Sequence, residues 1–277
     1  MPKPWVMVCT SVVIRLRRLP VSITVLAVIC AGWLMGGHPA LADPVRVDPG
    51  PELAAGKVIV GSGQNLPSME SPNPWDIGSY PADAVIAYQD GGVQLDQAEV
   101  AAAAVLWTRA WLRRACGDVK PETVRRCRAI AVFDVDDTLL SSYPVGLAND
   151  PQFGYDPAAS DAAVMACSTP VIEASREAYR IFRSWGMATA IITGRPESQR
   201  AATVDCLAEN GMNTWESVQL RPASDTGSAA TYKKSARDSL IDQGWSIGPS
   251  IGDQVSDMSY GSLGRGFLLP NVRYFLP

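Results

Sequence analysis

Along the second half of the chain, continuous apolar runs alternate with segments in which apolar residues recur every three or four positions. Residues 129–133 and 187–192 are continuous apolar runs, as expected for strands of a parallel sheet buried on both faces. Between them, apolar positions recur every three or four residues, which predicts a helix over residues 169–186, opened by Pro170 and ended by Gly186. The pattern therefore predicts a strand–helix–strand unit.

The same alternation continues to the end of the chain. Further elements are predicted as strands at 217–220, 246–251 and 266–269 and as helices at 196–211 and 231–243. An earlier helix is predicted from Asp96 to Cys116, because Asp96 and Glu99 stand at capping-box spacing. Strands that alternate with helices form βαβ units, so we predict an α/β fold: a Rossmann-like parallel sheet with helices on both faces, in one domain over residues 93–277.

Two segments do not follow this alternation. Residues 43–92 are rich in Pro, Gly, Ser and Asn, which predicts an irregular N-terminal arm. The interval 141–168 directly follows the first strand, and it predicts a small cap or binding insert. Its aromatic residues Tyr143, Phe153 and Tyr155 are expected either to stack on an aromatic ligand or to pack the core of the insert.

The N-terminus, residues 1–42, has the pattern of a signal peptide. Basic residues precede a short apolar run at 21–35, and residues 40–42 have the small-x-small pattern of a signal-peptidase site. We expect cleavage after Ala42, a secreted, periplasmic or cell-envelope location, and no stable membrane span. The alternative is an uncleaved signal that anchors the chain in a membrane, although a bilayer span needs about 20 apolar residues.

Charge and histidine content restrict the possible chemistry. The chain of 277 residues has a formal net charge of −4, and its single histidine, His38, lies in the expected signal. The acidic balance gives no reason to expect nucleic acid as a partner. A mature chain without histidine excludes Ser-His-Asp hydrolysis and His-ligated zinc, so acid–base chemistry falls mainly to carboxylates, which predicts an acidic pH optimum.

Four cysteines remain after the expected cleavage site. An even number in an oxidising compartment predicts two disulfides, and the sequence leaves all three pairings open. Their spacing forms no Cys-x-x-Cys pair, so a metal cluster is not expected. They are Cys116, Cys127, Cys167 and Cys206.

Acidic residues gather after two of the predicted strands. They are Asp134, Asp136 and Asp137 after the strand at 129–133, and Asp253 and Asp257 after the strand at 246–251. Open α/β sheets bind ligands at the carboxyl ends of their strands, and acids packed together there repel one another unless a cation lies among them. The pattern predicts a divalent cation with oxygen ligands, and the alternative is an acidic, solvated turn.

Two further positions are candidates for binding an anion. Thr193 and Gly194 follow the second strand at a predicted helix start, where a hydroxyl and free backbone N–H groups can bind an anion; the alternative is that Thr193 only caps the helix. Lys233, near the start of the helix at 231–243, can reach a phosphate, whereas most lysines are simply solvated.

Together these motifs resemble the haloacid dehalogenase-like (HAD) hydrolase superfamily, and most closely its acid phosphatase branch, which includes bacterial class B/C-type and plant acid phosphatases. The resemblance lies in FDVDDTLL from residue 133, IITGR from 191, YKKSAR from 232 and IGDQVSDM from 251. Leu269-Pro270-Asn271 also looks like that branch. The branch commonly has Tyr-Lys-Ser where this chain has Lys234 after Lys233, so Lys233 is the expected phosphate ligand and Lys234 the alternative.

The resemblance implies an acid phosphatase that acts on small phosphomonoesters. Asp134 would be the nucleophile that forms an aspartyl-phosphate, and Asp136 the general acid and then base. One Mg²⁺ would be held by Asp134, the backbone carbonyl of Asp136, Asp253 and Asp257, and the substrate would be bound by Thr138, Thr193, Gly194 and Lys233. The alternatives are a phosphotransferase of the same fold and a non-catalytic phosphate- or ligand-binding protein. The sequence does not indicate the oligomeric state.

Overall fold

The computed structural model describes residues 10–12, 27–29, 59–61, 82–149 and 153–276. The chain divides into two compact units, Met1–Arg46 and Val47–Pro277. Within the described part of the chain, no helix is both long and apolar enough to span a bilayer.

The described residues of the first unit form two short strands. Strand β1 (Thr10–Val12) pairs antiparallel with β2 (Ala27–Ile29). The rest of the predicted signal at 1–42 lies outside the described residues, so its cleavage after Ala42 stays a prediction.

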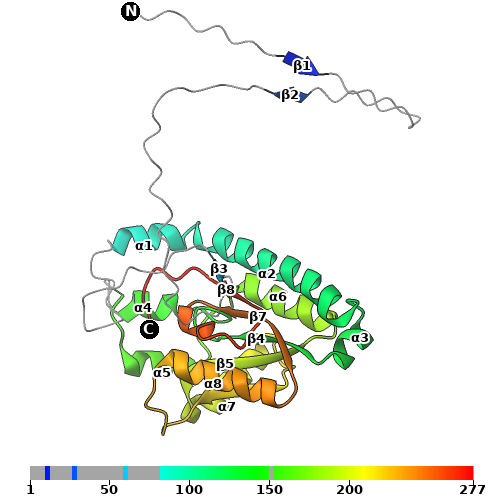
Figure 1. Cartoon of the computed structure of the whole chain (residues 1–277). Helices are drawn as coiled ribbons and strands as arrows, with labels where there is room; N and C mark the ends of the chain where they lie inside the picture. The colour runs from blue at the N-terminus through cyan, green and yellow to red at the C-terminus, as the bar shows by residue number, and fades with distance from the viewer. Residues whose placement is uncertain (1–9, 13–26, 30–58, 62–81, 150–152, 277) are drawn as a thin grey trace, which may run out of the picture. The chain divides into compact units, whose positions relative to one another are not determined.

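The second unit is built on a six-stranded parallel sheet with the strand order β3-β8-β7-β4-β5-β6 (Figure 1). The strands are β3 (Ile59–Gly61), β4 (Ala129–Phe133), β5 (Ala188–Pro196), β6 (Ser217–Arg221), β7 (Ser246–Gly252) and β8 (Arg265–Leu268). Central β4 pairs with β5 on one side and with β7 on the other, so the chain order reverses at this point. The carboxyl ends of these three strands meet where open α/β sheets bind their ligands.

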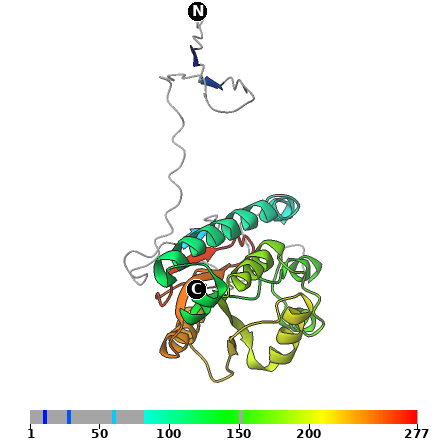
Figure 2. The same ribbon diagram turned by 90° about the vertical axis from the view of Figure 1, so that its right-hand side faces the viewer.

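Alternate residues of β4 lie on opposite faces of the sheet. Ala129, Ala131 and Phe133 belong to one buried cluster, and Ile130 and Val132 belong to another. The first cluster includes side chains of helices α2 (Val93–Cys116) and α6 (Glu173–Ser184), which lie together on one face, and the second includes side chains of α8 (Ala229–Asp242) (Figures 1 and 2). The predicted α/β fold with helices on both faces is confirmed.

Helix α2 begins earlier than the sequence predicted. It starts at Val93, and Asp96 lies inside its first turn. The carboxylate of Asp96 accepts a hydrogen bond of 2.5 Å from the hydroxyl of Tyr88 and does not cap the helix. Tyr88 belongs to α1 (Ala82–Gln89), so a contact between two helices replaces the predicted local cap.

The segment after β5 also differs from its prediction. Strand β5 continues through residues 193–195, and η1 (Glu197–Gln199) and α7 (Arg200–Glu209) follow it. The predicted helix start at Pro196 is therefore wrong by one short turn. Helix α6 likewise begins at Glu173, three residues after Pro170, because Val171 forms a bridge with Leu140.

The predicted irregular arm at 43–92 contains regular elements in its described part. Strand β3 pairs with β8 at the edge of the sheet, and α1 precedes α2. The expectation of irregular structure is wrong for these residues. Pairing with β8 is a tertiary interaction, and composition alone does not reveal it.

In its described part, the insert at 141–168 forms two short helices, α4 (Tyr143–Asn149) and α5 (Pro157–Met165). Figure 1 shows them near one another at one end of the second unit. Helix α5 is capped at its start by the carboxylate of Asp156, which accepts hydrogen bonds from the backbone N–H groups of Ala158 and Ala159.

The four cysteines form two disulfides, as predicted, and the structure selects one pairing. Cys116–Cys127 joins the end of α2 to the end of α3 (Pro121–Arg126). Cys167–Cys206 joins the end of the insert to α7.

Candidate active site

Three aspartates that are far apart in the sequence meet at the carboxyl edge of the sheet. Asp134 follows β4, Asp253 follows β7, and Asp257 ends the short helix η2 (Val255–Asp257). One carboxylate oxygen from each lies within 4.8 Å of the others, and all three side chains are buried. The predicted acidic cluster therefore forms, with Asp136 outside this group of three.

A buried lysine lies against this cluster. Lys233 of α8 is 5 % exposed, and its Nζ donates to Asp134 Oδ1 at 3.0 Å and to Asp257 Oδ1. Lys234 instead pairs with Asp238 at the surface of the helix. The structure thus distinguishes the two lysines: Lys233 faces the acids and Lys234 does not.

The cluster has more negative charge than Lys233 balances. Burial raises the pKa of Asp134 well above its usual value, and the charges of Asp257 and Asp253 act in the same direction. Burial and the charge of Asp257 raise the pKa of Asp253 to about 7. Burial alone would lower the pKa of Lys233, but Asp134 and Asp257 raise it above its ordinary value.

These residues fit a hard divalent cation. Three buried carboxylates offer oxygen ligands of the kind that Mg²⁺ prefers, and a single ammonium leaves them with a net negative charge. A cation at this place would offset both the burial and the mutual repulsion that raise the pKa values of Asp134 and Asp253.

The position of Asp257 depends on a glycine at the end of β7. A Cβ atom at Gly252 would overlap the carboxyl group of Asp257. The same carboxylate accepts a hydrogen bond of 2.9 Å from the backbone N–H of Gln254. The close approach of Asp257 to the strand therefore requires glycine at position 252.

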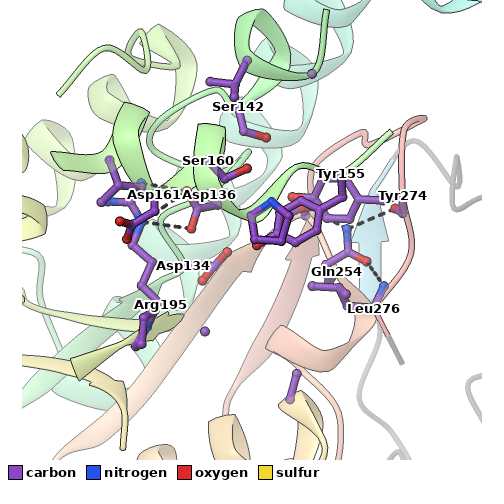
Figure 3. Close-up of a pocket in the computed structure, with 18 of the residues that line it drawn as sticks. Asp134, Asp136, Ser142, Tyr155, Ser160, Asp161, Arg195, Gln254, Tyr274 and Leu276 are labelled. Atoms are coloured by element: carbon purple, nitrogen blue, oxygen red, sulfur yellow. Dashed lines mark hydrogen bonds and ion pairs between the residues drawn. The ribbon is translucent and has the colours of Figure 1, made fainter. Parts of the chain in front are cut away.

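Asp136 is held by an arginine for which sequence reasoning gave no role. Arg195 Nη2 lies 2.7 Å from Asp136 Oδ1, and Arg195 Nε lies 3.0 Å from Oδ2 (Figure 3). The guanidinium is buried, and its Nη1 donates to Thr203 at 3.1 Å. One feature of the sequence could have indicated this role: Arg195 directly follows Gly194 at the end of a strand.

Asp137 joins the insert to the C-terminal segment. This buried residue accepts hydrogen bonds from the hydroxyl of Ser142 at 2.6 Å, from Arg273 Nη2 at 2.5 Å and from the hydroxyl of Tyr274 at 2.7 Å. Its φ of 51° places it in the left-handed region. Asp137 therefore orders the chain around the cluster and is not a member of it.

The two threonines that were predicted to bind phosphate are fully buried. The Thr138 hydroxyl donates to Asp253 Oδ1 at 3.4 Å, and Thr193 Oγ1 accepts a hydrogen bond of 3.2 Å from the backbone N–H of Arg195. Because β5 continues past Thr193, this residue caps no helix. Gly194 is exposed and lines the pocket in front of the acids, and a Cβ there would meet nothing within 4 Å.

A cavity of about 500 Å³ opens above the cluster (Figure 3). Its walls come from the insert, from the ends of β5 and β7, and from the C-terminal segment, and Asp134, Asp136, Asp253 and Lys233 line it. The insert therefore borders the site, as a cap would. This volume leaves room for a small organic group beside a phosphate.

The aromatic residues of the insert lie partly in packed contacts and partly at the cavity. Tyr143 and Phe153 stack on each other with ring centroids 5.7 Å apart, and Phe153 is buried with Val85 of α1. These two residues pack together with α1, and Phe153 also lines the cavity. Tyr155 is 43 % exposed and lines the cavity (Figure 3).

The fold and the acidic strand ends are those of a hydrolase of the HAD type, and comparison with known proteins specifies the family. The chain belongs to the HAD superfamily, subfamily IIIB (acid phosphatase), whose model matches residues 89–277. The resemblance drawn from the sequence motifs is thereby confirmed.

Two plant proteins illustrate this relationship. Acid phosphatase 1 of Solanum lycopersicum is 34 % identical over 154 residues, which cover 54 % of this chain and 60 % of that protein. Vegetative storage protein 2 of Arabidopsis thaliana is 31 % identical over 152 residues, which cover 53 % of this chain and 56 % of that protein. The chain thus spans little more than half the length of the relatives it matches.

A solved structure shares the fold. The class C acid phosphatase of Bacillus anthracis superposes with a TM-score of 0.53 at 19 % identity, covering 70 % of this chain and 86 % of that one. At this identity the likeness shows the fold alone.

Proposed function

We propose that this protein is an exported acid phosphatase that hydrolyses small phosphomonoesters through an aspartyl-phosphate intermediate. The observation that carries the proposal is the position of Asp134. Its carboxylate lines the cavity, at the end of the central strand, beside the buried ammonium of Lys233. A substrate phosphate in this cavity would meet a nucleophile and a positive charge together.

The first step forms the intermediate. A carboxylate oxygen of Asp134 attacks phosphorus, and the bond from phosphorus to the leaving oxygen breaks. Asp136, which also lines the cavity, gives its proton to that oxygen, so the product leaves as a neutral alcohol.

The second step restores the enzyme. Asp136 takes a proton from water, and the resulting hydroxide attacks phosphorus and breaks its bond to Asp134. Inorganic phosphate leaves, and Asp134 is again a carboxylate. Lys233, Thr193 and the backbone N–H of Gly194 are the groups we assign to the phosphoryl oxygens, where they would stabilise the negative charge of the transition state.

Asp134, the backbone carbonyl of Asp136, Asp253 and Asp257 are the groups that would hold one Mg²⁺. When bound, this cation would shield the charge of the phosphate from the attacking carboxylate. Oxygen ligands and the excess negative charge of the three buried acids support this assignment.

Two features support an extracellular setting. The described part of the chain holds two disulfides, which persist in oxidising compartments. The export signal predicted at residues 1–42 agrees with them. A small phosphorylated molecule is the expected partner, and the acidic balance does not favour nucleic acid.

The test is hydrolysis of p-nitrophenyl phosphate at acidic pH by the purified chain, with EDTA and with Mg²⁺ added back. We expect EDTA to abolish turnover, Mg²⁺ to restore it, and Asp134→Asn to lower kcat by at least about a thousandfold. Asp238→Asn, the same substitution at the surface, is the matched control. Circular dichroism verifies the fold of each variant.

Three outcomes would change the assignment. More than a tenth of the activity in Asp134→Asn would exclude it as the nucleophile. Release of more nitrophenol than phosphate in the presence of glycerol would indicate a phosphotransferase. Phosphate binding without any turnover would indicate a non-catalytic binding protein.

A further inference from the structure

We propose that Asn271 and Gln254 are positioning residues for Asp253: their side-chain amides hold one carboxylate oxygen of Asp253 and leave the other for the cation. The inference rests on the cation site of the proposed function. The inference gives a role to Asn271, in the segment after β8. The sequence motifs pointed to this segment but assigned it no role.

The two amides converge on the same atom. Asn271 Nδ2 donates to Asp253 Oδ2 at 2.7 Å, and Gln254 Nε2 donates to the same oxygen, also at 2.7 Å. Oδ2 therefore has two short hydrogen bonds, whereas Oδ1 has only the contact of 3.4 Å with Thr138 among the hydrogen bonds described. A carboxylate held in this way cannot rotate without breaking both bonds.

The charge of Asp253 is also left unneutralised by these partners. Asp134 and Asp257 share the ammonium of Lys233, while no ion pair in the described part of the chain involves Asp253. Its two short hydrogen bonds come from neutral amides, which orient an anion and keep its charge. Asp253 is therefore the member of the cluster whose carboxylate no ion pair in the described part of the chain occupies.

Both donors are themselves held in place. Asn271 Oδ1 accepts the backbone N–H of Arg273 at 2.9 Å, and Gln254 Oε1 accepts the backbone N–H of Leu276 at 2.8 Å. Figure 3 shows Gln254 beside Tyr274 and Leu276 at the edge of the cavity. Asn271 and Gln254 are buried, so water cannot readily replace either amide.

The role of such outer partners can be measured without any turnover. Loss of a group that orients a metal-binding residue typically weakens metal affinity by about 10–100-fold. We therefore choose Mn²⁺ as the probe, because it suits oxygen ligands and its free form is quantified by electron paramagnetic resonance. The full chain is titrated as wild type, Asn271→Ala and Gln254→Met.

Asn210→Ala is the matched control. Asn210 also uses its amide to hold the fold, donating to the backbone carbonyl of Cys206 at 2.8 Å, but it contacts none of the acids described above. We expect the Kd for Mn²⁺ to rise at least about tenfold in Asn271→Ala and in Gln254→Met, and to stay within about twofold in Asn210→Ala. Thermal unfolding in EDTA shows whether each variant is folded.

The outcomes separate this inference from the proposed function. Failure of the wild type to bind Mn²⁺ would overturn the cation site, and this inference with it. Binding by the wild type with a Kd within twofold in both variants would overturn this inference alone. If Asn271→Ala does not fold, Gln254→Met decides, because methionine keeps the length of the side chain and removes the donor.

Discussion

Arg195 and Asp136 form a two-pronged ion pair, with Nη2 at 2.7 Å from Oδ1 and Nε at 3.0 Å from Oδ2. The arginine side chain is 3 % exposed and the aspartate side chain 35 %. The buried guanidinium thus fixes the orientation of a carboxylate that remains accessible from the cavity. Such an arrangement holds a catalytic carboxylate in one defined position relative to the reacting atoms.

We expect Arg195→Lys to lower kcat by about tenfold or more, because an ammonium cannot reproduce the planar fork. Arg200→Lys is the control, since Arg200 pairs with Glu197 at the surface. Steady-state kinetics with p-nitrophenyl phosphate measure both variants. Equal kcat values for Arg195→Lys and the wild type would show that the ion pair does not orient Asp136.

The two neighbouring lysines of α8 should respond very differently to the same substitution. Lys233→Met removes the ammonium that pairs with two buried acids, Asp134 and Asp257, so we expect kcat to fall by at least about a hundredfold and the protein to lose about 3 kcal/mol of stability. Lys234→Met removes an exposed pair, and its cost should stay below about 1 kcal/mol. Activity assays and urea denaturation measure kcat and stability for both variants. A comparable loss of kcat in Lys233→Met and Lys234→Met would contradict the assignment of Lys233.

The two disulfides should contribute unequally to stability. Cys167–Cys206 closes a loop of 39 residues and Cys116–Cys127 one of 11. On the chain-entropy account, closing these loops stabilises the folded chain by about 4 and 3 kcal/mol, respectively. Compared with Cys116→Ser/Cys127→Ser, the double variant Cys167→Ser/Cys206→Ser should therefore be less stable by about 1 kcal/mol. Because Cys167 ends the insert beside the cavity, this variant should also be cleaved faster by protease within residues 141–168. Equal cleavage in both variants would show that the bridge does not fasten the insert.

Asp238 should give a measurable pH dependence of stability. Hydrogen bonds from Lys234 and Ser262 lower the pKa of its carboxyl below the usual value of about 4. The charged form is thus favoured by folding, so the added stability is present above the unfolded pKa and is lost as the pH falls through the folded pKa. The exposed position limits the effect to under about 1 kcal/mol. The stabilities of wild type and Asp238→Asn in urea denaturation should therefore differ at pH 7 and converge as the pH falls through the folded pKa of Asp238, and a constant difference would contradict this account.

The local pattern of the chain was sufficient to predict most elements of the fold. Strand β4 has the predicted bounds, because a continuous apolar run suits a strand buried on both faces. Asp134 after β4 and the two acids after β7 were also predicted correctly as neighbours, since parallel strands bring their carboxyl ends to one edge. Periodicity and strand-end position are local properties, and a sequence displays them directly.

The tertiary structure decided which side chains meet. It paired the cysteines, turned Lys233 toward Asp134 and Lys234 away, and brought Arg195 to Asp136 across 59 residues of sequence. It also brought Asn271, which lies 18 residues after Asp253 in the sequence, to the Asp253 carboxylate. Contacts of this kind depend on the packing of distant elements, so residue type and spacing determined the chemistry available to this protein, whereas the folded chain determined the partner of each group.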